Sequence, residues 1–262
     1  MSSKKKQILI GTSGFSYPDW KGVFYPKDLN KEKWLEYYSK HFEFCELNFS
    51  YYRMPQEKQL EKYLDYPLQY AIKAHKSLTH DRIESKNARQ DFAQAVEVLH
   101  GGGHLAAVLL QFPYSFAYTP PNRKYLFELL EDLSPLPLIV EFRHPIWIKE
   151  SVFEWLEKKD WGISMLDSPQ VSNGMPPYEK VTSEIAYLRF HGRNDANWWN
   201  GDNVSRYDYE YSRKELEDWL PRIADMANQA ATTYIAFNNH ARGQAIKNAN
   251  QLSKILKKAE LI

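Results

Sequence analysis

Short apolar segments alternate with longer amphipathic segments along the chain. Each apolar segment has the length of a strand, and several are apolar on both faces, such as LAAVLL at residues 105–110. A strand that is apolar on both faces is typical of a parallel sheet covered by helices. We therefore predict eight strands, at residues 7–12, 44–48, 69–73, 105–111, 138–143, 162–167, 185–191 and 232–238.

The segments between these strands carry apolar residues at the spacing of an amphipathic helix. Clear apolar stripes of this kind occur at residues 34–42, 92–99, 216–223 and 245–256. A capping box, in which a serine and a glutamate three residues later close the first turn of a helix, is predicted at Ser151 with Glu154 and at Ser212 with Glu215.

The interval at residues 167–183 differs, because it is rich in Pro, Gly and Asn. We predict that one helix is shortened or missing there, between strands six and seven. Eight alternations in 262 residues favour a TIM-type (β/α)8 barrel over an open sheet. No G-x-G-x-x-G follows a strand, which argues against a dinucleotide-binding sheet. With no linker in the sequence, we expect a single TIM-barrel domain over residues 1–262.

The overall charge narrows the classes of partner. The formal net charge is +1, so no field of the whole molecule attracts nucleic acid or a membrane. The single cysteine, Cys45, excludes an internal disulfide and suits a reducing compartment. No apolar run approaches the ~20 residues of a membrane helix, and residues 1–7 are too polar for a signal peptide. We expect a soluble, cytoplasmic protein.

Polar residues end the predicted strands. Seven strands end on a charged or amide side chain, and the first ends on hydroxyls. Active sites of barrels lie at these carboxyl ends, and strand side chains alternate between two faces. We expect a ring of polar groups formed by Glu46, Asn48, Lys73, Gln111, Glu141, Arg143, Asp167, Arg189, His191, Asn238 and Asn239. Structural ion pairs, such as Glu46 with Lys73 or Glu141 with Arg143, are the alternative interpretation.

The same segments carry a family resemblance. Residues 11–17 (GTSGFSY), with Trp20 and Gly22 after them, resemble the opening of the YecE-like proteins, the domain of unknown function family 72. Further matches are ELN at 46–48, TH at 79–80, LQFP at 110–113, VEFRH at 140–144, RFHG at 189–192 and FNN at 237–239. The resemblance covers nearly the whole chain and implies a TIM-type barrel. It implies no reaction, and Phe15 stands where the family usually has Trp.

Two carboxylates are the predicted acid/base pair. Glu46 and Glu141 face one cleft, where one can be held neutral and the other ionised. The same pair would also suit a glycosidase. His191 is predicted to transfer protons or bind a metal, Asp167 is a further catalytic candidate, and Lys73 would tune the carboxylates.

Two arginines are the predicted anchors of the substrate. Arg143 and Arg189 present planar forks that suit carboxylate or phosphate groups. Asn48, Gln111, Asn238 and Asn239 would orient the ligand. Further substrate-binding candidates are His80, His144 and Trp198, the last in a loop where aromatic residues beside arginines can stack on a base or a sugar. Packing of these aromatic rings on the barrel rim is the alternative.

The sequence requires no cofactor. A divalent metal would need converging ligands, for which Glu46, Glu141, Asp167 and His191 are the candidates. We expect an enzyme of hydrolase, lyase or isomerase type that acts on a polar, anionic small molecule bearing a phosphate or carboxylate. The alternatives are a nucleic-acid-binding or metal-dependent phosphodiester-processing barrel, and a non-catalytic small-molecule sensor. The sequence predicts no oligomeric state.

Overall fold

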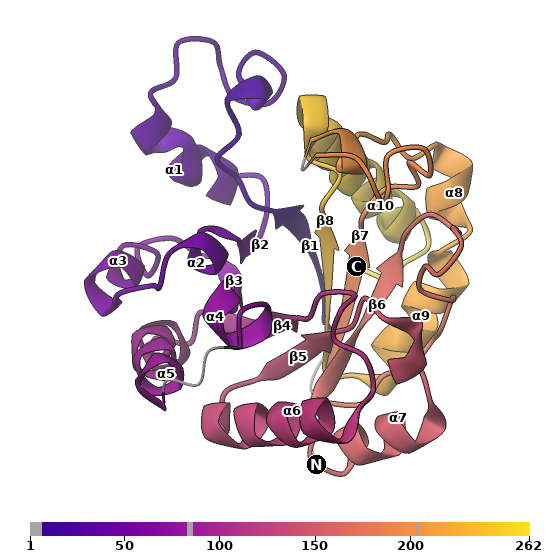
Figure 1. The fold of residues 1–262 in the computed structure, drawn as a ribbon. Coiled ribbons are helices and arrows are strands. Elements are labelled where there is room, and N and C mark those ends of the chain that lie inside the picture. The colour runs from indigo at the N-terminus through magenta and orange to yellow at the C-terminus, as the bar shows by residue number, and fades with distance from the viewer. Residues whose placement is uncertain (1–6, 83–85, 203) are drawn as a thin grey trace, which may run out of the picture.

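Eight parallel strands close into a barrel in chain order (Figure 1). The computed structural model describes residues 7–82, 86–202 and 204–262, so residues 1–6, the basic start of the predicted domain, lie outside the described residues. β1 pairs with both β2 and β8, which confirms the predicted TIM-type barrel. The strands are β1 Gln7–Ser13, β2 Phe44–Leu47, β3 Gln69–Lys73, β4 Leu105–Gln111, β5 Leu138–Glu141, β6 Gly162–Asp167, β7 Ile185–Phe190 and β8 Thr232–Phe237.

The helices lie outside the ring of strands (Figure 1). They are α1 Trp34–Ser39, α2 Phe49–Tyr52, α3 Glu57–Glu61, α4 Lys76–Thr79, α5 Lys86–Gly101, α6 Pro120–Leu133, α7 Glu150–Glu157, α8 Arg213–Glu217, α9 Leu220–Gln229 and α10 Gln244–Lys258. Residues 168–184 contain no helix, as predicted. No helix in the described ranges has the length and apolar character needed to cross a bilayer.

Two details of the predicted helices differ from the structure. The apolar stripe at residues 216–223 is divided between α8 and α9. Pro221 lies in the first turn of α9, where a proline is well tolerated. The capping box of Ser212 with Glu215 is confirmed, whereas the one at Ser151 is wrong. Lys149 has the extended backbone of an N-cap, so Ser151 already lies inside α7.

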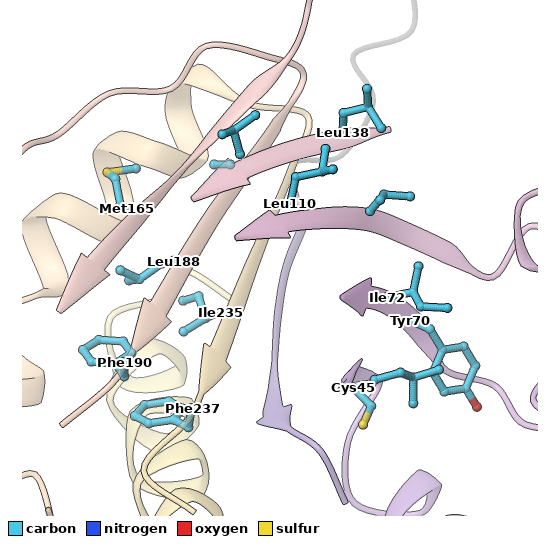
Figure 2. Close-up of a cluster of buried hydrophobic side chains, with 14 of the residues drawn as sticks. Cys45, Tyr70, Ile72, Leu110, Leu138, Met165, Leu188, Phe190, Ile235 and Phe237 are labelled. Atoms are coloured by element: carbon cyan, nitrogen blue, oxygen red, sulfur yellow. The ribbon is translucent and has the colours of Figure 1, made fainter. Parts of the chain in front are cut away.

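The buried apolar side chains form two layers on either side of the barrel wall. The inner layer fills the lumen and includes Phe44 and Ala71. The outer layer packs against the helices and includes their chain neighbours Cys45 and Ile72; Figure 2 shows part of this outer layer on β2 to β8. Successive residues therefore alternate between lumen and outer wall. This alternation decides which strand-end side chains reach the site.

Candidate functional site

A cavity of about 610 Å³ lies at the carboxyl ends of the strands. Lys73 and Arg189 reach it because they follow the lumen-facing Ala71 and Tyr187 by two residues. The predicted site residues that line this cavity are Asn48, Lys73, His80, Gln111, Arg143, Arg189, Trp198 and Asn238.

The two candidate carboxylates lie beneath the cavity rather than in its lining. Glu46 and Glu141 are fully buried and neither lines the cavity. Arg189 binds Glu46 through two bonds, Nε to Oε2 at 2.9 Å and Nη2 to Oε1 at 2.6 Å. Its Nη1 donates to Glu141 Oε2 at 2.7 Å. Arg189 thus joins the two carboxylates across the lumen.

Further donors complete the binding of these carboxylates. Tyr187 donates its hydroxyl to Glu46 Oε2 at 2.9 Å, and Arg143 Nε donates to Glu141 Oε1 at 2.6 Å. Burial alone would raise the pKa of the Glu141 carboxyl, but Arg189 and Arg143 hold it well below its ordinary value. Glu141 is therefore ionised at neutral pH and acts as a structural acceptor. The Glu141–Arg143 pair that the sequence suggested is present, and Glu46 pairs with Arg189 instead of Lys73.

His191 is held between Arg143 and Asn238. Arg143 Nη2 lies 3.2 Å from His191 Nε2, and Asn238 Nδ2 lies 3.0 Å from His191 Nδ1. Both neighbouring groups are hydrogen-bond donors. Burial, and Arg143 beside the ring, lower the pKa of His191 to about 3. The ring is neutral at physiological pH and does not line the cavity.

Lys73 is a titratable group that lines the cavity. Its Nζ donates to Gln111 Oε1 at 2.8 Å and lies 4.4 Å from the centre of the Tyr51 ring. Within the described residues, no carboxylate lies within ion-pair distance of Nζ. Burial, and next the charge of Arg189, lower the pKa of Lys73 to about 7.

Asp167 does not join the lumen group, which corrects the sequence-based expectation. Its side chain lies on the same face of β6 as those of Ile163 and Met165, which pack in the outer layer. Its carboxylate accepts bonds from Arg193 Nη2 at 2.6 Å, Tyr211 Oη at 2.6 Å and Trp219 Nε1 at 2.7 Å.

His144 and Asn239 are also outside the cavity lining. Each directly follows a cavity-lining residue, Arg143 or Asn238, in the sequence. Because side chains alternate along a strand, His144 and Asn239 point to the outer face. His144 Nδ1 accepts the backbone N–H of Ile146 at 3.2 Å, which caps the turn η3 Pro145–Trp147. Asn239 Nδ2 donates to Tyr209 O and to Asn248 Oδ1, each at 2.8 Å. Both residues order the loops around the cavity.

The charge count of the lumen changes as a result. The sequence predicted three carboxylates against three cations, and the structure removes Asp167 from this set. Two carboxylates, Glu46 and Glu141, face three cations, Lys73, Arg143 and Arg189. Charge is balanced only when Lys73 is neutral, and an anion bound in the cavity would balance it when Lys73 is protonated.

The four candidate metal ligands do not converge. Asp167 is on the outer wall, and the oxygens of Glu46 and Glu141 accept bonds from arginines. Over residues 7–82, 86–202 and 204–262, no cluster of three His, Cys, Asp or Glu side chains has the arrangement of a metal site.

Several lining residues were not predicted. Tyr51 lies in α2, shortly after β2, and His240 follows the end of β8. Their closeness to strand ends is the feature of the sequence from which they could have been predicted as lining residues. Arg206 and Tyr207 come from the long loop after β7, whose path the sequence does not define. Arg206 Nη2 donates to Gly201 O at 3.1 Å, while its buried Nε has no hydrogen-bond partner among the described residues.

A second cavity adjoins the first. It has a volume of about 620 Å³ and shares Tyr17, Asn48 and Tyr52 with the first cavity. Its other lining residues include the aromatic Phe15 and Phe49, the aliphatic Leu35 and Leu47, and charged residues of both signs. The two cavities together offer a cation-lined compartment beside a more apolar one.

The fold and cavity define a (β/α)8-barrel protein with a cationic pocket at the carboxyl ends of its strands. Residues 9–261 match the family described as protein of unknown function DUF72, and the chain belongs to this family. The resemblance to the YecE-like family 72 proteins is thereby confirmed.

Relatives of known sequence or structure agree with this assignment. The UPF0759 protein YunF of Bacillus subtilis is 31% identical over 270 residues, covering 95% of this chain and 94% of YunF. The crystal structure of a DUF72 family protein from Thermotoga maritima has a TM-score of 0.88 at 35% identity, covering 96% of this chain and 99% of that one. A DUF72 family protein from Enterococcus faecalis has a TM-score of 0.85 at 24% identity over 96% of each chain, which shows the fold alone.

Proposed function

We propose that this protein is an enzyme that binds a small phosphate- or carboxylate-bearing molecule in the first cavity and transforms it by acid/base chemistry. One observation carries the proposal. The cavity is lined by four cationic side chains, Lys73, Arg143, Arg189 and Arg206, and its described lining residues include no carboxylate. A cavity lined by charges of one sign concentrates a ligand of the opposite sign.

Arg143 is the proposed anchor of the anion. Its Nε and Nη2 are engaged by Glu141 and His191, and no bond among the described residues uses Nη1. The guanidinium carbon of Arg143 lies over the Trp198 ring, 5.7 Å from its centre, in a cation–π contact that helps to fix the guanidinium. A guanidinium fixed in this way presents donors to an anion at low entropic cost.

Lys73 is the proposed proton-transfer group, in place of Glu46, Glu141 and His191. Its pKa of about 7 allows it to accept and release a proton at physiological pH, which is the property that a general acid/base needs. Glu141 and His191 hold one protonation state at neutral pH. Their proposed role is to position Arg143 and Arg189.

Thermal unfolding in the presence of small anions tests the proposal. The probes are inorganic phosphate and sets of phosphorylated and carboxylated metabolites, each followed by chromatography for product. We expect anions to raise the unfolding temperature of the native protein, and Arg143→Gln to weaken their binding at least about tenfold. Arg222→Gln is the control, because Arg222 is 41% exposed and pairs with Glu179. Equal affinities for the two variants would contradict the proposal, and binding without any product would favour a sensor.

A second candidate function is binding of single-stranded nucleic acid. Three aromatic side chains at the cavity mouth are exposed, Tyr52 by 65%, Trp199 by 46% and Tyr114 by 39%, and such rings can stack on bases. A fluorescent single-stranded oligonucleotide titrated at several salt concentrations distinguishes this candidate. Contacts with many phosphates would give an affinity that falls steeply with salt, whereas a site for one small anion would give little or no oligonucleotide binding.

A further inference from the structure

We propose that Lys73 attacks the carbonyl carbon of an anionic aldehyde or ketone and forms a covalent imine with it. This inference rests on the proposed function, because it assigns the substrate class of the same cavity. It gives Lys73 the role of a nucleophile as well as that of a proton carrier.

The surroundings of Lys73 suit a neutral amine. Its two close partners, the Gln111 amide oxygen and the Tyr51 ring, are uncharged, at 2.8 Å from Nζ and 4.4 Å from Nζ to the ring centre. The neighbouring Arg143 and Arg189 each have a carboxylate at 2.6 Å. Of the three cations Lys73, Arg143 and Arg189, only Lys73 has no carboxylate within ion-pair distance among the described residues. A lysine kept only for structural pairing would be expected to share these carboxylates.

The protonation state supports the same role. Burial and the charge of Arg189 lower the pKa of Lys73 to about 7, so a substantial fraction of the amines is neutral at pH 7. An ordinary lysine, with a pKa near 10.4, is neutral in only roughly 0.04% of molecules at that pH. Desolvation beside another cation is a known way to activate a lysine nucleophile.

The cationic neighbours match the charges of the substrate and of the reaction. Arg143 and Arg206 line the same cavity and can hold a phosphate or carboxylate. In the addition step, the Nζ lone pair forms the C–N bond, and the carbonyl π electrons move to oxygen, which takes up a proton. Arginine donors near that oxygen stabilise the charge that develops on it.

The second step completes the balance. The nitrogen of the adduct loses a proton, the hydroxyl takes one up and leaves as water, and the C=N bond forms. One carbonyl compound, one neutral lysine and one proton therefore give one iminium ion and one water, with no oxidant or reductant. The iminium ion withdraws electrons from the adjacent carbon, so the reactions it supports are C–C bond cleavage and loss or transfer of a proton at that carbon. This places the activity in the lyase or isomerase classes.

Borohydride trapping on the full-length protein tests the inference. The probes are pyruvate and dihydroxyacetone phosphate, with uncharged dihydroxyacetone as the control carbonyl. Sodium borohydride reduces an imine to a stable amine, which intact mass and peptide mapping detect. We expect one adduct per chain, located at Lys73, to form at least about tenfold faster with an anionic probe than with dihydroxyacetone. Lys73→Met should abolish it, and Arg143→Gln should remove the preference for the anionic probes.

Lys247→Met is the matched control, because Lys247 is exposed and paired with Glu210. It should leave the trapping unchanged. Peptide mapping of the native protein locates the adduct without reliance on any variant. Adducts spread over surface lysines, or none above the Lys73→Met background, would overturn the inference. If inorganic phosphate still binds in that case, the proposed function stands and the imine alone is refuted; if no anion binds, both are refuted.

Discussion

Two clusters of charged side chains lie on opposite sides of the barrel wall. The lumen cluster comprises Glu46, Glu141, Lys73, Arg143, Arg189 and His191. The outer cluster comprises Asp167, Arg193, Glu215, Tyr211 and Trp219, between β6, β7 and the helices behind them. Both lie near the carboxyl ends of strands and both join carboxylates to arginines, so neither residue type nor depth along the barrel distinguishes them.

Charge balance does distinguish them. The lumen cluster has three cations for two carboxylates, whereas the outer cluster has one arginine for two. The first cavity, beside the lumen cluster, is lined by cations alone among its described charged residues. The outer cluster borders a cavity of about 420 Å³ whose lining includes both signs, among them Asp167, Asp195, Arg193 and Arg222. The lumen cluster has a surplus of positive charge beside a cavity lined by cations, which indicates a site for an anion. The outer cluster has a surplus of negative charge beside a cavity lined by both signs, which offers no such site.

The largest expected effect comes from Arg189→Met. The substitution leaves Glu46 and Glu141 buried without their shared partner, because Arg189 is 2% exposed and both carboxylates are fully buried. We expect the free energy of unfolding to fall by about 3–5 kcal/mol, measured by urea denaturation. Arg213→Met, which breaks an exposed pair with Glu217, is the control and should change it by less than about 1 kcal/mol. Similar losses in the two variants would mean that the lumen pairs contribute no more than surface pairs.

The next effect concerns the pH dependence that Lys73 gives the lumen cluster. Because the pKa of Lys73 is lowered to about 7 in the folded protein, the unfolded chain binds more protons between pH 7 and the ordinary lysine pKa. Stability from this group therefore rises with pH over that range, at no more than about 1.4 kcal/mol per pH unit.

Urea denaturation at pH 7, 8 and 9 measures this dependence. The native protein should gain stability relative to Lys73→Met as the pH rises, and the difference should be constant below pH 6. Parallel profiles of the two proteins from pH 7 to 9 would show that Lys73 keeps an ordinary pKa.

A smaller effect is expected from Arg193→Met in the outer cluster. Asp167 keeps its bonds from Tyr211 and Trp219, and the Arg193 side chain is 34% exposed. We expect a loss of about 1–3 kcal/mol in unfolding free energy and no change in affinity for inorganic phosphate. A loss of phosphate affinity as large as that of Arg143→Gln would remove the functional distinction between the two clusters.

The smallest effect is expected from Ser212→Ala. Ser212 caps α8 in a box with Glu215, which also contacts Arg193 of the outer cluster. We expect a loss of about 1 kcal/mol in urea denaturation, with phosphate affinity unchanged. An unchanged unfolding free energy would show that the cap contributes nothing in this context.

The apolar pattern was sufficient to predict the strands and the barrel, because strands buried on both faces leave little freedom in their position. The alternation rule also explains where the site prediction failed. Asp167 is one residue out of phase with the lumen positions of its strand, and the same holds for His144 beside Arg143 and Asn239 beside Asn238. The alternation of side chains at each strand end therefore predicts that Asp167, His144 and Asn239 point away from the lumen.

Other features of the site could not be predicted from the sequence. The partner of Glu46 is Arg189, 143 positions away in the sequence, and only the closure of the barrel brings the two side chains within hydrogen-bond distance. The lowered pKa of Lys73 depends on its burial and on that arginine rather than on its neighbours in sequence. The path of the loop that carries Arg206 into the cavity depends on its packing against the rim.

Anomalous diffraction from crystals soaked in tungstate, a heavy analogue of phosphate, would show whether the first cavity binds an anion. We expect a strong anomalous peak in the first cavity, in contact with Arg143 and Lys73, and its loss in Arg143→Gln. We expect no peak at Arg193 in the outer cluster. A cavity without tungstate, together with peaks on the outer cluster or on surface lysines, would contradict the claim that the surplus charge of the lumen cluster forms an anion site.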